Sequence, residues 1–241
     1  MIKAYYLLAK PGIIYGNALT AIGGYFLAAK GIFDLSLFLS MLFGLSFVIG
    51  SACVFNNIMD QGIDSKMART KKRALVTKTI PEFHAVVYGS ILGILGFLLL
   101  LCNTNVLTAL IAFIGFIFYV IVYGIFKRKS VHGTVIGSIS GAVPPVVGYC
   151  AVTNNLDLGA FLLFIILVIW QMPHFYAIAI FRRDDYVAAS IPVLPIKKGL
   201  FQTKIQMDAT TTIRIIPKKE IKIIRFKRGF DSCLICKKKS N

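Results

Sequence analysis

The fold is decided by the stretch Asn56-Asn57-Ile58-Met59-Asp60-Gln61-Gly62-Ile63-Asp64, which joins a long apolar run to a basic one. The 25 residues from Leu35 to Met59 carry no charged side chain, and a dense basic run, Ser65 to Arg73, follows the second aspartate. If the apolar run is a membrane-spanning helix, Asp60 and Asp64 lie one turn apart on the same helical face. Paired carboxylates commonly hold a divalent metal, and a metal beside Arg and Lys suits a diphosphate. The stretch therefore predicts chemistry on a phosphorylated, lipid-like substrate at a membrane surface.

The composition is that of a membrane protein. Of the 241 residues, 57% are hydrophobic and 15% charged, and the mean hydropathy is +0.76; about a quarter of a soluble domain is charged. A spanning helix needs ~20 apolar residues, and each of five charge-free stretches is long enough for one. The longest has 44 residues and a polar break at Cys102–Asn105, so it predicts two helices. The sequence thus predicts an all-α polytopic membrane bundle of six spans, drawn from Pro11 to Ala29, Leu35 to Met59, Phe83 to Phe126, Ser130 to Leu156 and Leu158 to Phe181.

The basic residues are distributed unevenly between the predicted loops. In a soluble protein the net charge of +17 would suggest nucleic-acid binding. Here Lys and Arg gather on one side of the membrane, as cytoplasmic loops do, whereas the opposite loops hold only Lys30, Asp34 and Asp157. We therefore expect a cytoplasmic N-terminus and no nucleic-acid partner. The basic residues of the first side are Lys3, Lys10, Lys66, Arg69, Lys71, Lys72, Arg73, Lys78, Lys127, Arg128, Lys129, Arg182, Arg183, Lys197 and Lys198.

The fifth and sixth predicted spans carry features of a bundle with a chamber. Pro144-Pro145 removes two helical hydrogen bonds and predicts a kink, which is compatible with an opening for substrate. His174 shares a helical face with Trp170, and a lone His in a span suggests a function, with a packed, hydrogen-bonded His as the alternative. Asp184-Asp185 follows on the same side of the membrane as the first acidic pair. Two acidic clusters facing one compartment strengthen the metal hypothesis.

The last 41 residues break this pattern. From Phe201 to Asn241 there are 11 basic and 3 acidic residues and no charge-free run of spanning length. The Cys233–Cys236 pair has no second CxxC, so a metal or redox role is not expected. The stretch from Ile213 to Phe230 is rich in Ile and Lys and suits an anionic membrane surface. The predicted division is a membrane domain at 1–200 and a basic tail at 201–241.

Three motifs carry a resemblance to a known family. They are Asn56-Asn57-x-x-Asp60-x-x-x-Asp64, then Arg69-Thr70-x-x-Arg73, and then Trp170-Gln171-Met172-Pro173-His174-Phe175-Tyr176 through Asp185-Tyr186 to Ile191-Pro192-Val193-Leu194-Pro195. From Lys10 to about Gly199 the chain resembles the protohaem IX farnesyltransferases, which are UbiA-type intramembrane prenyltransferases. Beyond Gly199-Leu200 the likeness ends, the last three spans of the family are absent, and the tail looks like out-of-frame or unrelated coding. The resemblance implies nine spans around a cavity open to the cytoplasm, in a bacterial inner membrane.

The resemblance also implies a reaction and a set of site residues. The expected reaction transfers the farnesyl group of farnesyl diphosphate to a vinyl group of protohaem IX, giving haem O, with Mg²⁺ as the cofactor. Metal binding and catalysis fall to Asp60, Asp64 and Asp185, with Asp184 as an additional acid outside the family position. Contacts to the diphosphate fall to Asn56, Asn57, Arg69 and Arg73, and His174 is expected to contact haem or handle a proton.

Three alternatives stay open at this point. In the first alternative the fold is the same, but the acceptor is a quinone precursor or another aromatic ring. A transporter that couples to ions is the second, and it ranks lower because Asp60, Asp64 and Asp185 lie at helix ends rather than inside spans. In the third, the chain is a catalytically inactive, truncated remnant.

Overall fold

Every regular element in residues 1–211, the part of the chain that this computed structural model describes, is helical. The predicted Cys233–Cys236 pair and the Ile- and Lys-rich stretch lie outside the described residues. The helices are α1 (Ile2–Leu8), α2 (Pro11–Ala29), α3 (Leu35–Asp64), α4 (Glu82–Asn103), α5 (Val106–Ile117), the π-helical segment η1 (Phe118–Tyr123), α6 (Gly124–Lys129), α7 (Gly133–Gly141), α8 (Val143–Thr153), α9 (Leu158–Phe181), α10 (Arg183–Ala188), α11 (Leu194–Lys197) and α12 (Gly199–Thr211).

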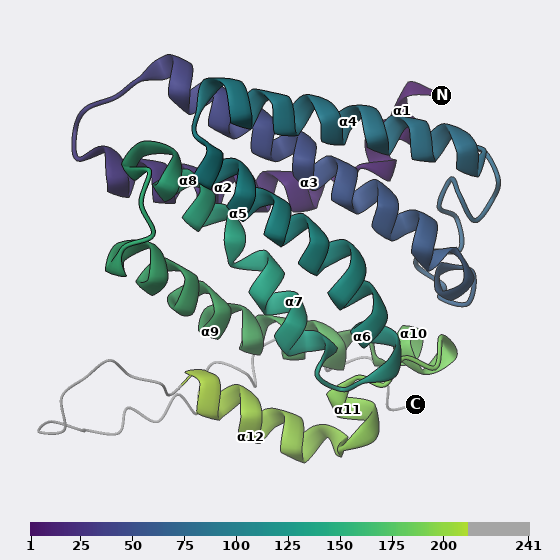
Figure 1. The fold of residues 1–241 in the computed structure, drawn as a ribbon. Helices are drawn as coiled ribbons and strands as arrows, with labels where there is room; N and C mark the ends of the chain where they lie inside the picture. The colour runs from purple at the N-terminus through teal and green to yellow at the C-terminus, as the bar shows by residue number, and fades with distance from the viewer. Residues whose placement is uncertain (212–241) are drawn as a thin grey trace, which may run out of the picture.

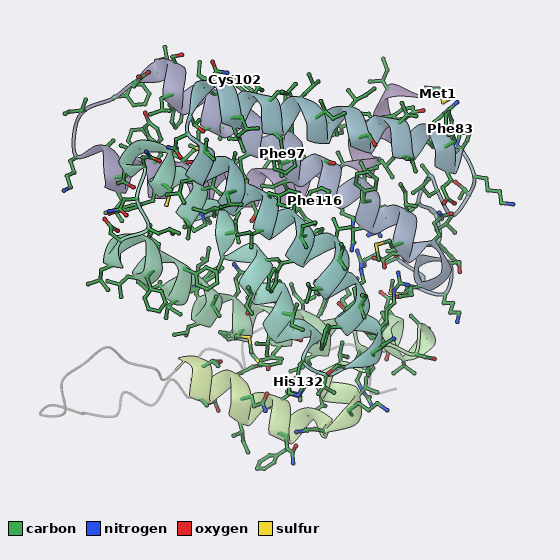
Figure 2. All side chains as sticks on the ribbon, in the orientation of Figure 1. Met1, Phe83, Phe97, Cys102, Phe116 and His132 are labelled. Carbon is green, nitrogen blue, oxygen red and sulfur yellow. The ribbon has the colours of Figure 1, made fainter. Side chains whose placement is uncertain are left out.

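Six helical segments within residues 1–211 are long and apolar enough to cross a membrane, which confirms the predicted all-α bundle of six spans. They are α2, α3, α4, Val106–Lys129, Gly133–Thr153 and α9. Figure 1 shows α1, the 65–81 loop, α6 and α10 at one end of the bundle, which we call the polar end. The turns that join α2 to α3, α4 to α5 and α8 to α9 lie at the opposite end. Large apolar side chains cover the outside, as in a bundle surrounded by lipid (Figure 2).

Glycines allow the spans to approach closely, and this places α3 in the middle of the bundle. A Cβ added to Gly96 of α4 would lie 2.8 Å from the carbonyl oxygen of Gly44 on α3. A Cβ on Gly24 of α2 would overlap the Pro145 carbonyl of α8. Such contacts between small residues are the usual means of packing helices in lipid. As a result, α3 packs against α2, α4, α5 and α8 together.

Two irregularities shape the spans that face α3. The fifth span is divided at Ala142, between α7 and α8, and Pro144 and Pro145 occupy the first turn of α8. The fifth span is therefore interrupted near the predicted place, and the interruption precedes the prolines because a proline fits the first turn of a new helix. The fourth span contains the π-helical segment η1, and such wide turns are frequent at functional sites.

The predicted boundary at residue 200 falls inside a helix. α12 begins at Gly199 and packs along α9, so the helical bundle continues past the boundary. Figure 1 shows α12 running beside α9. The division into domains stays a prediction, and the structure adds that the first residues of the predicted tail are helical and packed.

Candidate functional site

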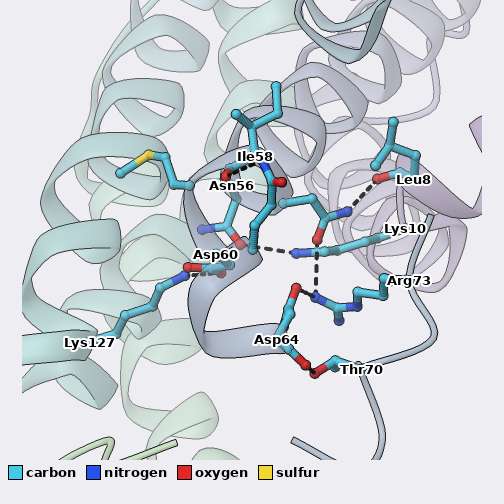
Figure 3. A network of polar contacts seen from close by, with 12 residues as sticks. Leu8, Lys10, Asn56, Ile58, Asp60, Asp64, Thr70, Arg73 and Lys127 are labelled. Carbon is cyan, nitrogen blue, oxygen red and sulfur yellow. Dashed lines mark hydrogen bonds and ion pairs between the residues drawn. The ribbon is translucent and has the colours of Figure 1, made fainter. Parts of the chain in front are cut away.

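The acidic motif forms the last turns of α3, the longest helix of the described chain. Asp34 caps the start of α3 by accepting the backbone N–H of Leu37, and Asp64 is the last helical residue, 30 positions later. The helical register directs Asn56, Asn57, Asp60 and Asp64 inward, and all four are buried. Carboxylates in such a setting need charged or hydrogen-bonding partners. The polar end supplies them (Figure 3).

Asp60 is held by two cations from the end of the fourth span. Lys127 donates to Oδ2 of Asp60, and Arg128 donates to Oδ1 at 3.0 Å and also to the Met59 carbonyl. Asp60 is only 7% exposed, whereas Arg128 is exposed. The buried carboxylate of Asp60 thus has a cation on each of its two oxygens.

Asp64 is held by the loop that follows α3. Arg73 donates to Oδ2 of Asp64 at 2.6 Å and to Oδ1 of Asn57 at 3.1 Å, so one guanidinium joins two motif residues. Asn57 in turn donates to the Leu8 carbonyl at the end of α1. The Thr70 hydroxyl donates to the backbone carbonyl of Asp64 at 2.9 Å. The 65–81 loop is thereby folded back onto the end of α3.

Lys10 joins the network from the junction of α1 and α2. Its backbone has a φ of 55°, in the left-handed region, and its ammonium group donates to Oδ1 of Asn56 at 3.0 Å. Burial lowers the pKa of Lys10 to about 8, against the attraction of Asp60. The amide nitrogen of Asn56 is buried and has no partner among the described residues, so it is free to bind a ligand.

The second acidic segment reaches the same end of the molecule. Oδ1 of Asp185 accepts the backbone N–H of Ala68, at 3.1 Å, in the loop after α3. Beneath this contact, Met67 packs against Ala189 and Ile191. Asp184 is exposed. Residues predicted to act together from positions 60–64 and 185 are therefore brought to one end of the bundle.

Two predicted members are not gathered into this network. Arg69 is exposed at the polar end, with the phenol of Tyr186 nearby, and makes no ion pair among the described residues. Asp185 does not join the first two carboxylates in a cluster, since no group of three or more acidic, His or Cys side chains is assembled within residues 1–211. The metal set Asp60, Asp64 and Asp185 stays a prediction.

An apolar cavity of about 650 Å³ extends from the polar end into the bundle. Lys127 connects the charged network to the cavity, because it pairs with Asp60 and also lines the cavity. Tyr119 and Tyr123 of η1 line one side. On the α9 side the ring of His174 stacks on Trp170, with centroids 5.9 Å apart and planes at 13°, and both rings line the cavity. His174 is thus placed at the cavity and not packed inside the protein.

Sequence reasoning did not identify Lys10, Lys127 and Arg128 as site residues. All three were interpreted only as part of the basic loops that set the topology. Lys127 lies 67 positions from the acid that it pairs with, and Lys10 lies 46 positions from Asn56. One signal was available: buried carboxylates require cations, and these three residues occur at span ends on the predicted side of the motif.

Comparison with known proteins places the chain among membrane prenyltransferases. The UbiA prenyltransferase family matches residues 17–216. The protoheme IX farnesyltransferase of Protochlamydia amoebophila (strain UWE25) is 55% identical over 207 residues, which cover 86% of this chain and 73% of that protein. The protoheme IX farnesyltransferase of Yersinia enterocolitica is 56% identical over 205 residues, which cover 85% and 69%.

A solved structure shares the fold. The UbiA homolog from Archaeoglobus fulgidus bound to DMAPP and Mg²⁺ superposes with a TM-score of 0.71 at 16% sequence identity, over 87% of this chain and 74% of that one. At this identity the likeness shows only that the helices are arranged in the same way. The family match covers most of the chain, and the two bacterial relatives are similar along the same region. The chain belongs to the UbiA prenyltransferase family.

Proposed function

We propose that this chain transfers the farnesyl group of farnesyl diphosphate to a vinyl group of protohaem IX, giving haem O. The observation that carries the proposal is the junction at Lys127, where a charged network meets an apolar cavity. A prenyl diphosphate has the same two parts, a polyanionic head and an apolar tail. The choice of donor and acceptor is supported by the relatives that are 55% and 56% identical.

The charged network is suited to the leaving diphosphate. As the allylic C1–O bond breaks, its electron pair stays on the diphosphate, and the ammonium and guanidinium groups of Lys10, Arg73 and Lys127 offset the growing negative charge. These groups are already held by Asn56, Asp64 and Asp60, so little reorganisation is needed. Arg69, exposed at the polar end, is suited to attracting the substrate.

The first acidic pair fits Mg²⁺. This ion prefers oxygen ligands and is commonly bound by one or two carboxylates together with the phosphates of a substrate. Asp60 and Asp64 provide two buried carboxylates one turn apart, and Asp185 lies at the same end. When bound, Mg²⁺ would supply positive charge for the departing diphosphate.

The cavity is suited to the rest of the reaction. Its apolar lining holds the farnesyl chain and limits the access of stray water to the allylic cation. The vinyl double bond of haem attacks C1, which leaves a cation on the inner vinyl carbon. Addition of water there, with loss of one proton, gives the hydroxyethylfarnesyl group.

The distribution of charge supports a location and an orientation. The chain is a multi-pass membrane protein, and within residues 1–200 its Lys and Arg residues, apart from Lys30, occur at the polar end. We infer that the polar end and the N-terminus face the cytoplasm, across a bacterial inner membrane. Access of a water-soluble protease to the 65–81 loop in right-side-out and inverted vesicles tests this orientation, and cleavage in right-side-out vesicles would contradict it.

Mass spectrometry of the products tests the proposed reaction. The 241-residue chain is placed in lipid vesicles with farnesyl diphosphate, haem and Mg²⁺, and farnesylated haem is the expected product. Asp60→Ala and Asp64→Ala should abolish Mg²⁺-dependent turnover, whereas Asp184→Ala, at an exposed acid, is the matched control. Unchanged haem O formation in both buried variants would refute the site assignment. Prenylation of an added aromatic acceptor in place of haem would favour the quinone-type alternative.

A further inference from the structure

A polar side chain that the proposed site has not used lies inside the cavity. Gln171 of α9 is 8% exposed and lines the cavity. Its amide makes no hydrogen bond to any residue in the described part of the chain. Buried polar groups are nearly always paired, so an unpaired amide that borders a cavity points to a partner that enters with the reactants.

The bundle makes room for this amide. An ideal Cβ on Gly141 of α7 would overlap Oε1 of Gln171, so only glycine permits the side chain its present position. Gly141 is the last residue of α7, next to the break between α7 and α8. The amide is therefore confined between two spans and is not a flexible surface group.

The position of Gln171 along the bundle can be read from α7. Gly133 lies against the backbone of Lys127, with an added Cβ 2.8 Å from its Cα, and Gly141 is eight residues further from the polar end. At 1.5 Å per residue this is about 12 Å deeper than Lys127. His174, three residues after Gln171 on α9, lies between the amide and the polar end and lines the same cavity. With the diphosphate at the polar end, the reacting carbons fall in this interval.

We propose that Gln171 positions the water molecule that completes the reaction. This inference rests on the proposed function. The amide carbonyl accepts a hydrogen bond from the water and aims its oxygen at the cation on the inner vinyl carbon. An oxygen lone pair forms the new C–O bond, and the proton that is released passes to the imidazole of His174. Without an oriented water, the same cation loses a proton from a neighbouring carbon and gives an alkene that is lighter by one water.

The ratio of hydrated to dehydrated product tests this role. Gln171→Met keeps the length of the side chain but removes both amide groups, and Gly141→Ala displaces the amide without removing it. In both variants we expect the ratio to fall about tenfold or more, because a misplaced reactant loses its orientation. The total farnesylated porphyrin should change far less. Since the ratio is measured within one sample, it does not depend on how much protein folds.

Ser140→Ala is the matched control, because Ser140 also lines the cavity but its hydroxyl already donates to the Gly137 carbonyl at 2.9 Å. The control should keep the ratio of the unmodified chain. A fully hydrated product in Gln171→Met, or a loss of total product at an unchanged ratio, would overturn the assignment of Gln171. If the unmodified chain makes no farnesylated porphyrin, the proposed function itself fails and takes this inference with it.

Discussion

The helices α3 and α9 both carry predicted site residues, yet they differ in how deeply they are buried and in how their site residues are held. Half of an apolar 18-residue stretch of α3 is buried inside the protein, against 11% of such a stretch of α9. The acids of α3 are fixed by ion pairs to Arg73, Lys127 and Arg128. On α9, His174 is stacked only on neighbouring rings, and Gln171 has no protein partner in the described region. The difference indicates that α3 is organised before substrate binds, whereas α9 offers groups that substrates must organise.

The largest expected effect is a loss of activity, which should be greater for a variant of α3 than for a variant of α9. Asp64→Asn removes the charge that Arg73 and a bound metal require, so kcat/KM should fall about a thousandfold or more. His174→Ala should lower kcat/KM for the hydrated product by about a hundredfold, as expected for a group that handles the proton released by the added water. Steady-state rates of haem O formation measure both. Equal losses in the two variants, or any loss in the exposed Asp184→Asn control, would remove the distinction.

Stability should respond to the loss of a partner of α3. Lys127→Met leaves Asp60 buried with Arg128 as its remaining cation, so the free energy of unfolding should drop by about 2–3 kcal/mol. Thermal unfolding in detergent measures the change. Lys129→Met alters an exposed cation two positions away and should leave the unfolding temperature unchanged. A similar shift in both variants would mean that the Asp60 pair contributes nothing specific.

A substitution that disturbs the packing against α3 should lower stability more than a substitution on α9. Gly96→Ala places a methyl group against the backbone of Gly44 and Val48, so α3 must shift, at a cost of about 1–3 kcal/mol. Ile166→Ala on α9 removes a side chain that is 51% exposed and should change stability by less. The control is Gly23→Ala, because no atom lies within 4 Å of its added Cβ. A greater loss in Ile166→Ala than in Gly96→Ala would contradict the comparison.

The smallest expected effect concerns pH at the α3 network. Because the pKa of Lys10 is lowered to about 8, its charge is lost above that pH and the KM for farnesyl diphosphate should rise a few-fold. In Lys10→Arg the side chain stays charged, so this rise should disappear. Burial of the charged amine opposes folding below pH 8, and this cost should fade between pH 8 and the ordinary pKa of 10.5. A KM profile that is the same in both proteins would remove Lys10 from diphosphate binding.

Much of the architecture could be predicted from the sequence, because lipid imposes strict rules on length and charge. Charge-free stretches located the six spans. The basic loops recur on one side of the membrane, and this placed Asp185 at the same end of the bundle as Asp60 and Asp64. An interruption of the fifth span near Pro144-Pro145 also followed from local chemistry, although the helix breaks earlier, at Ala142.

The partners inside the site could not be predicted with the same success. Lys10, Lys127 and Arg128 resemble ordinary loop cations in the sequence, and only tertiary packing shows which of them face an acid. The unpaired amide of Gln171 depends on the absence of a side chain at Gly141, thirty positions earlier. Contacts of this kind arise from the crossing of helices, which periodicity along one helix does not encode.

The π-helical segment Phe118–Tyr123 has a consequence for variation in length. It holds one more residue per hydrogen-bonded ring than its α-helical neighbours, so it sets the angular position of everything that follows it in the fourth span. Because the wide turn takes up one extra residue, removing a single residue there restores a regular α-helix and keeps Lys127 facing Asp60, whereas removing a residue from α6 ahead of Lys127 rotates it by about 100° around the axis. A one-codon deletion in this segment should thus be less harmful than a one-codon deletion in α6.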